Sequence, residues 1–302
     1  FMHVFGDFGT RGLPGTFKIF LVDVVVQMAR SEMVLTLPLR VYVDDAALIG
    51  REGGGDEQLV NDEMQRFQVW SADVTGVYWK ASKDRMAAVP QLYIGFWWDS
   101  RDFTRRLDET KLLRYLDGLA AAADSSCLTL QARQSLAGKM QRAIMTLPPG
   151  AACLLVNCYA LMSGLTLPWH RRRTTRAERL DYKFVHDLLQ LNLGKGYYSY
   201  AGFPVGPEYR SDASKSRGYT GGGWVGSDGF YDFFRYGTSA ARKPIDYLEG
   251  DAVVRACRSR GAAWRGLQIP FGIDNSAFQK SSAKGRSKAP RLNALLRELF
   301  VL

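Results

Sequence analysis

The chain has 302 residues, a formal net charge of +10 and four cysteines. A chain of this length can bury more than one hydrophobic core, so about two domains are expected. The cysteines form no C-x2-C pair and no histidine stands at metal-ligand spacing, which argues against a disulfide scaffold or a zinc site and favours reduced, mostly buried thiols in an intracellular protein.

The first predicted elements are a glycine-rich loop and a helix. The loop occupies residues 8–17 and reads Phe-Gly-Thr-Arg-Gly-Leu-Pro-Gly-Thr-Phe. It leads into an apolar stripe at helical spacing, which predicts a helix to about Arg30. The stripe consists of Phe17, Leu21, Val24 and Met28.

Next comes Tyr42-Val43-Asp44-Asp45, which sets two adjacent carboxylates between two apolar runs. The runs predict the arms of a tight β-hairpin with the aspartates at its tip. Paired acidic oxygens suit a hard divalent cation, Mg²⁺ or Mn²⁺, whose charge offsets their repulsion. The four residues alone leave a metal site and an acidic surface turn equally open.

A second helix and a strand follow the hairpin. A loop of three glycines, residues 53–55, precedes the helix, and acidic residues lie near its start. The acids are Asp56, Glu57, Asp62 and Glu63, and the apolar face consists of Val60, Met64, Phe67 and Val74. Leu92 to Phe96 is predicted to be a short apolar strand. Helix, acidic hairpin, helix and strand are the order of a polymerase palm.

These motifs resemble those of reverse transcriptases. Residues 8–17 resemble the pattern FG-x4-P-x2-F, residues 42–45 match the YxDD box at the family's usual distance, and residues 92–96 resemble the primer-grip strand. The resemblance implies a partial palm over residues 1–105 in which Asp44 and Asp45 hold the metal ions. It also implies an RNA template, a DNA primer and dNTPs as partners, with Tyr42 and Gly95 in contact with nucleic acid. Lys83 would be catalytic as a proton donor, and a solvated surface lysine is the alternative.

The middle of the chain predicts a helical thumb and connection over residues 106–195. Ser135 to Lys139 and Pro148 to Gly150 resemble the thumb of retroelement enzymes, particularly those of the DIRS-like type. No charge lies between Arg142 and His170, a stretch long enough to span a bilayer. Because Pro148-Pro149-Gly150 breaks it, a buried core helix of about a dozen residues and no membrane span are expected. Residues 194–208, rich in Gly, Tyr and Ser, are the predicted linker.

Three acids in the last third follow the order of ribonuclease H. Asp212 follows an extended segment that begins at Tyr209, and the glycine-rich strand Gly221 to Val225 comes next. Glu249 lies in a helix that begins at Ile245, and Asp274 ends a strand over Leu267 to Ile273. The apolar positions of that helix are Leu248, Ala252, Val253 and Ala256.

The resemblance to ribonuclease H implies an α/β domain with a mixed sheet over residues 196–302, truncated at its C-terminus. In it, Asp212, Glu249 and Asp274 would hold Mg²⁺ or Mn²⁺ against the RNA strand of an RNA–DNA hybrid. Lys284 to Ser287, together with Leu292 and Asn293, resemble the DIRS-like version of this module.

The predicted class of the whole chain is therefore α+β. Its basic clusters suit a phosphate backbone, and the residues assigned to nucleic-acid binding are Arg171, Arg172, Arg173, Lys284 and Arg286. Solvated basic loops are the alternative, and the oligomeric state is left open.

Two departures from these families shape the functional hypotheses. A third aspartate is expected well before the glycine-rich loop, whereas the chain starts seven residues before that loop. A further acid is expected after Asp274. The chain is therefore expected to be an internal piece of a retroelement polyprotein. One hypothesis is an enzyme fragment, and the other is a decayed copy that binds RNA–DNA hybrid without catalysis.

Overall fold

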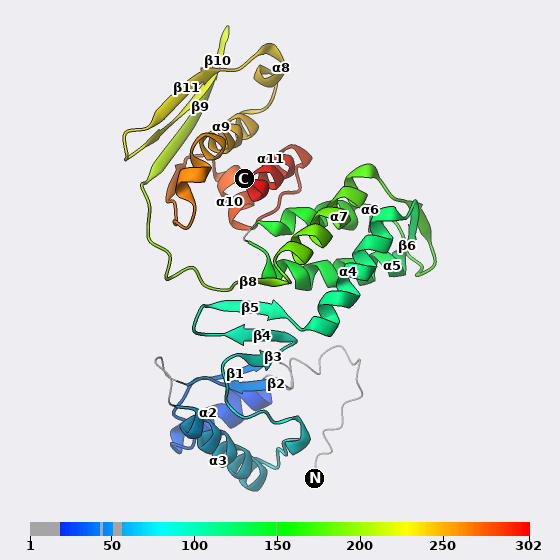
Figure 1. Ribbon diagram of the computed structural model, residues 1–302, viewed down its shortest axis with the longest axis vertical. Helices are drawn as coiled ribbons and strands as arrows, with labels where there is room; N and C mark the ends of the chain where they lie inside the picture. The colour runs from blue at the N-terminus through cyan, green and yellow to red at the C-terminus, as the bar shows by residue number, and fades with distance from the viewer. Residues whose placement is uncertain (1–18, 43–44, 51–55, 149) are drawn as a thin grey trace. The chain divides into compact units, whose positions relative to one another are not determined.

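The computed structural model describes residues 19–42, 45–50, 56–148 and 150–302. The glycine-rich loop at 8–17, the pair Val43 and Asp44, the three glycines at 53–55 and Pro149 lie outside the described residues. The chain divides into two compact units, one ending at Trp98 and the other beginning at Asp99. Helices and strands occur in both units, so the chain is mixed α+β, as predicted (Figure 1).

The first unit contains two hairpins and the helices beside them. Its elements are η1 (Ile19–Val25), α2 (Val26–Ser31), β1 (Leu39–Tyr42), β2 (Asp45–Leu48), α3 (Glu57–Thr75), η2 (Ala81–Lys83), β3 (Gln91–Tyr93) and β4 (Phe96–Asp99).

The predicted first helix begins as a π-helix, and this shifts its buried face. Leu21 is buried, but Val24 and Met28 of the predicted stripe are 42% and 37% exposed. The other buried positions are Val25, Val26 and Ala29. A π-turn bonds to the fifth residue along the chain instead of the fourth. A stripe drawn at 3.6-residue spacing therefore does not coincide with the buried face at Val24 and Met28. The helix itself ends at Ser31, close to the predicted end at about Arg30.

The hairpin predicted around the paired aspartates is confirmed in its backbone. β1 and β2 pair antiparallel, from Leu39 opposite Leu48 to Tyr42 opposite Asp45. The residues that join the two strands, Val43 and Asp44, lie outside the described part of the chain.

Helix α3 carries a buried glutamate, Glu63, which the sequence analysis grouped with the acids near the start of the helix. Glu63 is fully buried, and its carboxylate accepts hydrogen bonds from the Thr36 amide at 2.7 Å, the Thr36 hydroxyl at 2.6 Å and the Leu37 amide at 2.6 Å. Burial by itself raises the pKa of Glu63, but these hydrogen bonds outweigh it and hold the pKa below its usual value. Glu63 thus ties the chain before β1 to α3.

The segment predicted as one strand over Leu92 to Phe96 is a hairpin. β3 and β4 pair antiparallel, with Tyr93 opposite Phe96. Ile94 and Gly95 connect them with φ angles of 51° and 77°. Positive φ at both central residues is the geometry of a tight hairpin turn. The apolar run concealed the turn, which Gly95 signals.

The second unit begins with a helical part and a short two-stranded ribbon. Its elements are β5 (Thr104–Leu107), α4 (Glu109–Asp124), β6 (Cys127–Thr129), α5 (Leu130–Ala143), η3 (Ile144–Thr146), η4 (Ala151–Leu155), α6 (Val156–Met162), β7 (Arg171–Arg173), α7 (Arg176–Leu191) and β8 (Lys195–Tyr197).

A buried ion pair links helices α5 and α7 in this helical part. Arg133 of α5 and Glu178 of α7 are both fully buried, with Nε and Oε1 2.8 Å apart. Arg133 also donates to the carbonyl oxygens of Leu128 and Arg172, and the Tyr182 hydroxyl donates to Glu178 Oε1 at 2.7 Å. Buried charges are tolerated when they are paired and hydrogen-bonded in this way.

The predicted core helix after Pro148-Pro149-Gly150 is present as a 3₁₀ turn, η4, followed by α6. Its buried residues are Ala151, Cys153, Leu154, Leu155 and Cys158. No helix in the described ranges is long and apolar enough to cross a membrane. Burial raises the pKa of the Cys153 thiol to about 11. Cys158 is also buried and Cys257 is half-buried, whereas Cys127 is exposed.

The rest of the second unit is a mixed sheet with helices against one face. Its elements are β9 (Tyr209–Ser216), β10 (Tyr219–Gly226), β11 (Tyr231–Arg235), α8 (Thr238–Ala241), α9 (Ile245–Arg260), η5 (Gly261–Trp264), β12 (Phe271–Ile273), α10 (Ser276–Ala283) and α11 (Pro290–Val301). The strand order is β11-β10-β9-β12. The strands β9, β10 and β11 run antiparallel, whereas β12 is parallel to β9.

Helix α9 covers the sheet with the face that the sequence predicted (Figure 1). Leu248, Ala252, Val253 and Ala256 are all buried. The last predicted strand is shorter than expected, because only residues 271–273 form β12. Pro270, just before it, has no amide hydrogen to donate to a ladder.

The predicted linker at residues 194–208 is partly structured. Lys195 to Tyr197 form β8, which pairs antiparallel with β5. Beyond it, the side-chain amide of Gln268 donates to the carbonyl oxygens of Tyr200 and Phe203 at 2.7 and 2.8 Å. A composition rich in Gly, Tyr and Ser did not reveal these tertiary anchors.

Helix α11 packs against the helical part of the same unit. The Asn293 side-chain amide donates to the Cys153 carbonyl oxygen at 3.1 Å, and Arg297 forms an ion pair with Asp181. Burial raises the pKa of Asp181 to about 6, although Asn157 and Arg297 act in the opposite direction. The three-domain division into 1–105, 106–195 and 196–302 stays a prediction.

Candidate metal centre

The pairing of β12 with β9 brings two predicted acids level with each other. The parallel register aligns Ile273 with Ser211. The next residue along the chain is an aspartate in both cases: Asp212 within β9, and Asp274 directly after the end of β12. Neighbouring strands lie about 4.8 Å apart and residues at one level point to the same face. The register therefore sets the two carboxylates side by side.

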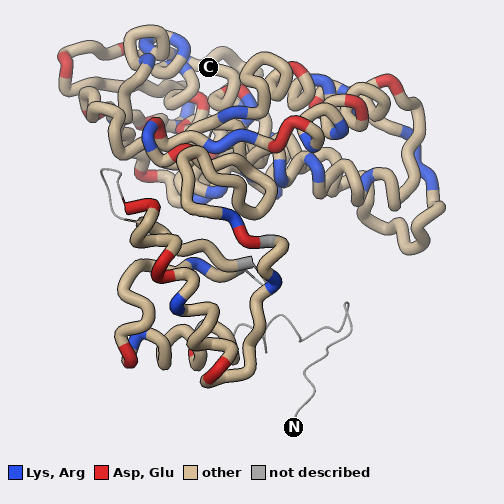
Figure 2. The backbone as a smooth tube through the Cα atoms, turned by 60° about the horizontal axis from the view of Figure 1, so that its bottom comes forward, with Lys and Arg blue, Asp and Glu red and all other residues tan. Residues whose placement is uncertain are grey.

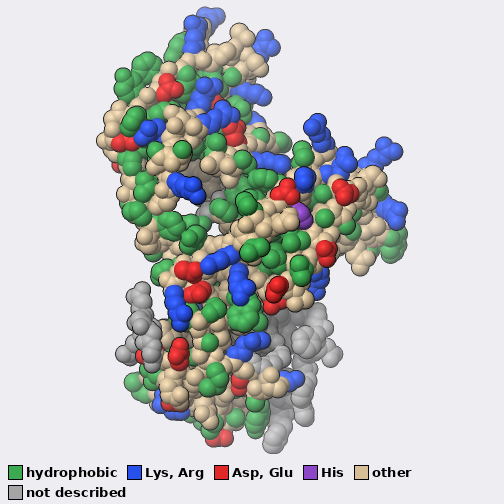
Figure 3. Space-filling model, viewed as in Figure 1, with side chains coloured by type: hydrophobic (Ala, Val, Ile, Leu, Met, Phe, Trp, Pro, Cys, Tyr) green, Lys and Arg blue, Asp and Glu red, His purple; other side chains and the backbone are tan. Residues whose placement is uncertain are grey.

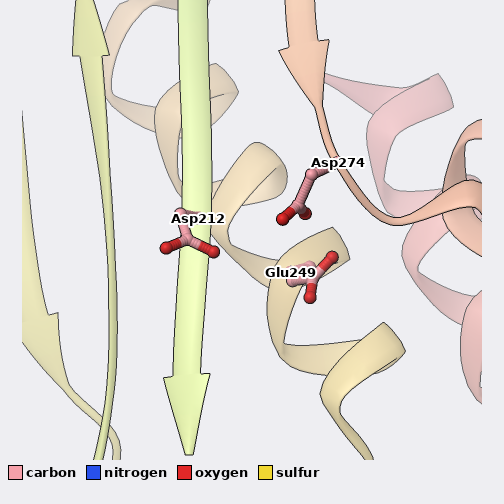
Figure 4. A group of neighbouring side chains, drawn as sticks. All are labelled: Asp212, Glu249 and Asp274. Carbon is pink, nitrogen blue, oxygen red and sulfur yellow. The ribbon is translucent and has the colours of Figure 1, made fainter.

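Glu249 completes the group from helix α9. It follows Leu248, whose side chain is fully buried in the core, and is itself 7% exposed. Each of Asp212, Glu249 and Asp274 offers one carboxylate oxygen, and these oxygens all lie within 4.8 Å of one another. Figure 4 shows the three side chains turned toward a common point from β9, α9 and the chain after β12. The structure thus brings together the three acids that the sequence singled out in its last third.

Two residues beside the triad hold its elements in place. Asn275 caps α10 by accepting hydrogen bonds from the amides of Ala277 and Phe278 at 3.0 and 2.9 Å. Gly250 allows α10 to approach α9, because a Cβ at this position would lie 2.5 Å from the Phe278 ring. Neither role was recognised from the sequence, although Asn275 before a serine is a helix-start signal.

The three carboxylates of the triad lie close together, and the pKa of Glu249 is raised. Burial, together with the neighbouring charges of Asp274 and Asp212, raises the pKa of Glu249 to about 7. Its Oε2 atom is buried and has no hydrogen-bond partner among the described residues. Asp212 and Asp274 are exposed, so the group opens to solvent on their side.

This donor set fits a divalent cation. A buried carboxylate oxygen without a partner, facing two further carboxylates, is the oxygen-rich and negatively charged environment that Mg²⁺ and Mn²⁺ prefer. A cation there would supply the charge that the group lacks and favour the ionised form of Glu249. The chain's residues therefore suit the predicted cofactor.

The residues predicted for polymerase chemistry are described only in part. Asp45 begins β2 opposite Tyr42, Lys83 ends η2, and Gly95 lies in the turn between β3 and β4. Asp44 lies outside the described residues. The catalytic roles of Asp44, Asp45 and Lys83 remain predictions.

The predicted nucleic-acid contacts divide into two kinds. Arg171, Arg173, Lys284 and Arg286 are exposed. Arg172 is half-buried, and its guanidinium donates to the carbonyl oxygens of Leu161 and Ser163 at 3.1 and 2.9 Å. This difference follows from the tertiary structure, since the three consecutive arginines look alike in the sequence.

Comparison with known proteins gives distant structural neighbours only. No protein-family model and no curated protein matches the chain. Structures of a foamy viral protease-reverse transcriptase are similar over most of this chain at 14% sequence identity. One, in complex with RNA/DNA hybrid, covers 94% of this chain with a TM-score of 0.47. Two others, in complex with double-stranded DNA, cover 95% and 97% with TM-scores of 0.45 and 0.47.

The chain spans between 36% and 57% of the length of those neighbours. A likeness at this level establishes no function for this chain. The functional proposal therefore rests on the chain's own residues.

Proposed function

We propose that the chain is part of a retroelement reverse transcriptase with a ribonuclease H module, and that Asp212, Glu249 and Asp274 form the nuclease site. The observation that carries this proposal is the convergence of the three carboxylates, with the Glu249 Oε2 atom buried and without a partner among the residues that the structure describes. A stable fold gains nothing from three clustered acids, whereas phosphoryl transfer needs carboxylates that hold cations. The substrate is the RNA strand of an RNA–DNA hybrid, and the cofactor is Mg²⁺ or Mn²⁺.

In this mechanism each acid has a distinct part. Asp212 and Asp274, on the exposed side, would hold the cation where a phosphate can approach it. Burial and the two neighbouring aspartates raise the pKa of Glu249 to about 7, so this carboxyl would be only partly ionised near neutral pH. A bound cation would favour its ionised form. The chemistry that the cation supplies is activation of the attacking water and stabilisation of the leaving oxygen.

The polymerase assignment is the second half of the proposal. It is supported by the order of motifs from the loop at residues 8–17 to the hairpin at Gly95, and by the β-hairpin that holds Tyr42 and Asp45. In it, Asp44 and Asp45 would hold the metal ions, Lys83 would donate a proton, and Tyr42 and Gly95 would contact the template and primer. The DIRS-like type is favoured by residues 135–139 and 284–287.

The alternative function is that of a catalytically inactive relic that binds RNA–DNA hybrid. It shares the basic residues with the enzyme, and Lys284 and Arg286 would contact phosphates in both cases. The two functions differ only in what the triad does.

The test is cleavage of an RNA–DNA hybrid with a labelled RNA strand by the 302-residue chain in Mg²⁺ or Mn²⁺. Loss of a residue that merely supports a metal ligand lowers activity about 10- to 100-fold. Asp212→Asn, Glu249→Gln and Asp274→Asn remove the ligands themselves, so each should lower cleavage at least about 100-fold. Hybrid binding in EDTA should be unchanged, because phosphate contacts come from basic residues.

Asp232→Asn is the matched control, since it makes the same change at an exposed carboxylate on β11 of the same sheet. It should cleave like the parent. A parent chain that folds and binds hybrid but does not cut it calls for a second measurement, with an appended segment that supplies the further acid expected after Asp274. If that longer chain does not cut either, and if it behaves like all three of its triad variants, the relic is established instead.

A further inference from the structure

The end of the helical part that holds the ribbon β6–β7 is predominantly basic, and the acid that directly precedes it is Asp124. Residues 125–177 contain seven Lys or Arg and no Asp or Glu (Figure 2). Arg171 and Arg173 of β7 are exposed, and Trp169, two residues before the strand, is 67% exposed. Figure 3 shows several Lys and Arg side chains on the drawn face of the helical part. This short segment therefore exposes one large aromatic ring and two guanidinium groups within five residues.

The three arginines of β7 do not all point to the same face of the ribbon. Successive side chains of a strand point to opposite faces, so Arg171 and Arg173 share one face and Arg172 lies on the other. Arg172 bonds to the carbonyl oxygens of Leu161 and Ser163, at the end of α6. Neither Arg171 nor Arg173 forms an ion pair with any residue that the structure describes. Of the three guanidinium groups, these two are thus available to a ligand.

The scaffold beneath this face is fixed. Buried Arg133 donates to carbonyl oxygens of both strands, at Leu128 and Arg172. On the Trp169 side, the Leu130 amide donates to the His170 carbonyl oxygen at 2.8 Å, and the Gln131 amide donates to the Pro168 carbonyl oxygen at 3.0 Å. These bonds pin the loop on both sides of Trp169, so little ordering is required when a ligand binds.

The charge of this face is opposed only in part from within: Asp124, directly before the basic segment, is exposed, whereas the acid after the segment is not. Glu178, the first acid after the basic segment, is fully buried and is paired with Arg133. The positive potential of Arg171 and Arg173 is therefore directed to solvent, where it suits a polyanion. A flat exposed ring beside the cations suits a polyanion that also has flat apolar groups, and an unpaired nucleobase is such a group.

We propose that Trp169, Arg171 and Arg173 form a contact surface for single-stranded nucleic acid. Trp169 stacks on an unpaired base, the two guanidinium groups bind neighbouring phosphates, and Arg172 takes no part. The inference shares with the proposed function only the class of substrate, because it concerns binding at a surface that holds no triad residue.

The experiment measures the affinity of the 302-residue chain for a labelled single-stranded RNA in EDTA, over a range of salt concentrations. Stacking of one base is worth about 1–3 kcal/mol by alanine substitution, so Trp169→Ala should weaken binding about 5- to 150-fold. Trp169→Phe should retain most of the affinity. The double variant Arg171→Gln/Arg173→Gln should reduce the slope of log affinity against log salt by about 1.4, because each phosphate neutralised on a single strand adds about 0.7 to the slope.

Two controls separate contact from structure. Arg114→Gln/Arg217→Gln removes two exposed positive charges elsewhere in the same unit and should leave the salt slope unchanged. Arg172→Gln should lower the melting temperature, because it leaves two carbonyl oxygens without a donor, but should keep the salt slope of the parent.

The proposal is overturned if Trp169→Ala and the arginine double variant bind RNA like the parent. It is also overturned if phosphatidylserine vesicles, and not RNA, are bound in a manner that depends on Trp169. Because binding is measured without metal, a triad that fails to cleave leaves this test intact. Cleavage with unchanged RNA binding would remove only the inference about Trp169.

Discussion

The helical part and the mixed-sheet part each bury a glutamate, but they treat its charge in opposite ways. Glu178 is fully buried, forms an ion pair with Arg133 and accepts a hydrogen bond from the Tyr182 hydroxyl, so its negative charge has a counter-charge. Glu249 is 7% exposed, faces two other carboxylates and keeps one oxygen without a partner. Its pKa is raised to about 7.

The comparison sets a charge that stabilises the fold beside one that the proposed metal site would use. Where a buried carboxylate serves the fold, hydrogen bonds and a counter-charge remove the penalty of burial, as also happens at Glu63. At Glu249 the free-energy cost of burying a carboxylate is not offset by a counter-charge of the chain. In the proposed site a bound cation would supply that charge.

The largest effect is expected from Arg133→Met. The change leaves Glu178 buried without its counter-charge and frees the carbonyl oxygens of Leu128 and Arg172. Breaking one side of a buried pair lowers the free energy of unfolding by about 3–5 kcal/mol. Urea unfolding followed by circular dichroism measures this loss. Arg114→Met, at an exposed position of α4, should stay within about 0.5 kcal/mol of the parent, and a loss of similar size in both variants would refute the structural role of the pair.

A smaller effect of opposite sign is expected from Glu249→Gln in EDTA. A carboxyl whose pKa is higher in the folded chain than in the unfolded chain binds more protons when folded. The free energy of unfolding of the parent should therefore fall as pH rises from the ordinary value of 4.5 through about 7, by up to about 3 kcal/mol. The glutamine variant lacks this loss, so it should be more stable than the parent at pH 8, and the difference should fade toward pH 4.5.

Thermal melts across this pH range, with the parent and Asp232→Asn as references, test the prediction. An identical pH profile in parent and Glu249→Gln would mean that Glu249 carries no unfavourable charge.

The smallest effect is expected from adding Mg²⁺ to the parent at pH 8. A cation that binds only the folded chain, at ten times its Kd, adds about 1.4 kcal/mol and raises Tm by about 3–6 °C. Glu249→Gln and Asp274→Asn should show little of this gain, because each lacks one ligand charge. Asp232→Asn should gain as much as the parent, and an equal gain in all four proteins would place the cation elsewhere.

Several features were predictable because they depend on local pattern. The apolar positions of α9, from Leu248 to Ala256, follow helical spacing and are buried as expected. The strand arms around Tyr42 and Asp45 pair as their apolar runs indicated. The order of Asp212, Glu249 and Asp274 along the chain was enough to nominate them as a group. The prediction of a single strand over Leu92 to Phe96 failed, because the apolar run contains the hairpin turn at Ile94 and Gly95.

The amino-acid sequence by itself determined which residue types could serve a site, because motif order and periodicity are properties of the chain. Only the tertiary structure decided which charges are satisfied. Arg171 and Arg172 are neighbours of the same type, yet strand alternation exposes one and ties the other to two carbonyl oxygens. Glu178 and Glu249 are both buried helical glutamates, yet packing brings an arginine to the first and two aspartates to the second. The difference arises because electrostatic energy depends on distances between residues far apart in the sequence, and the fold alone sets those distances.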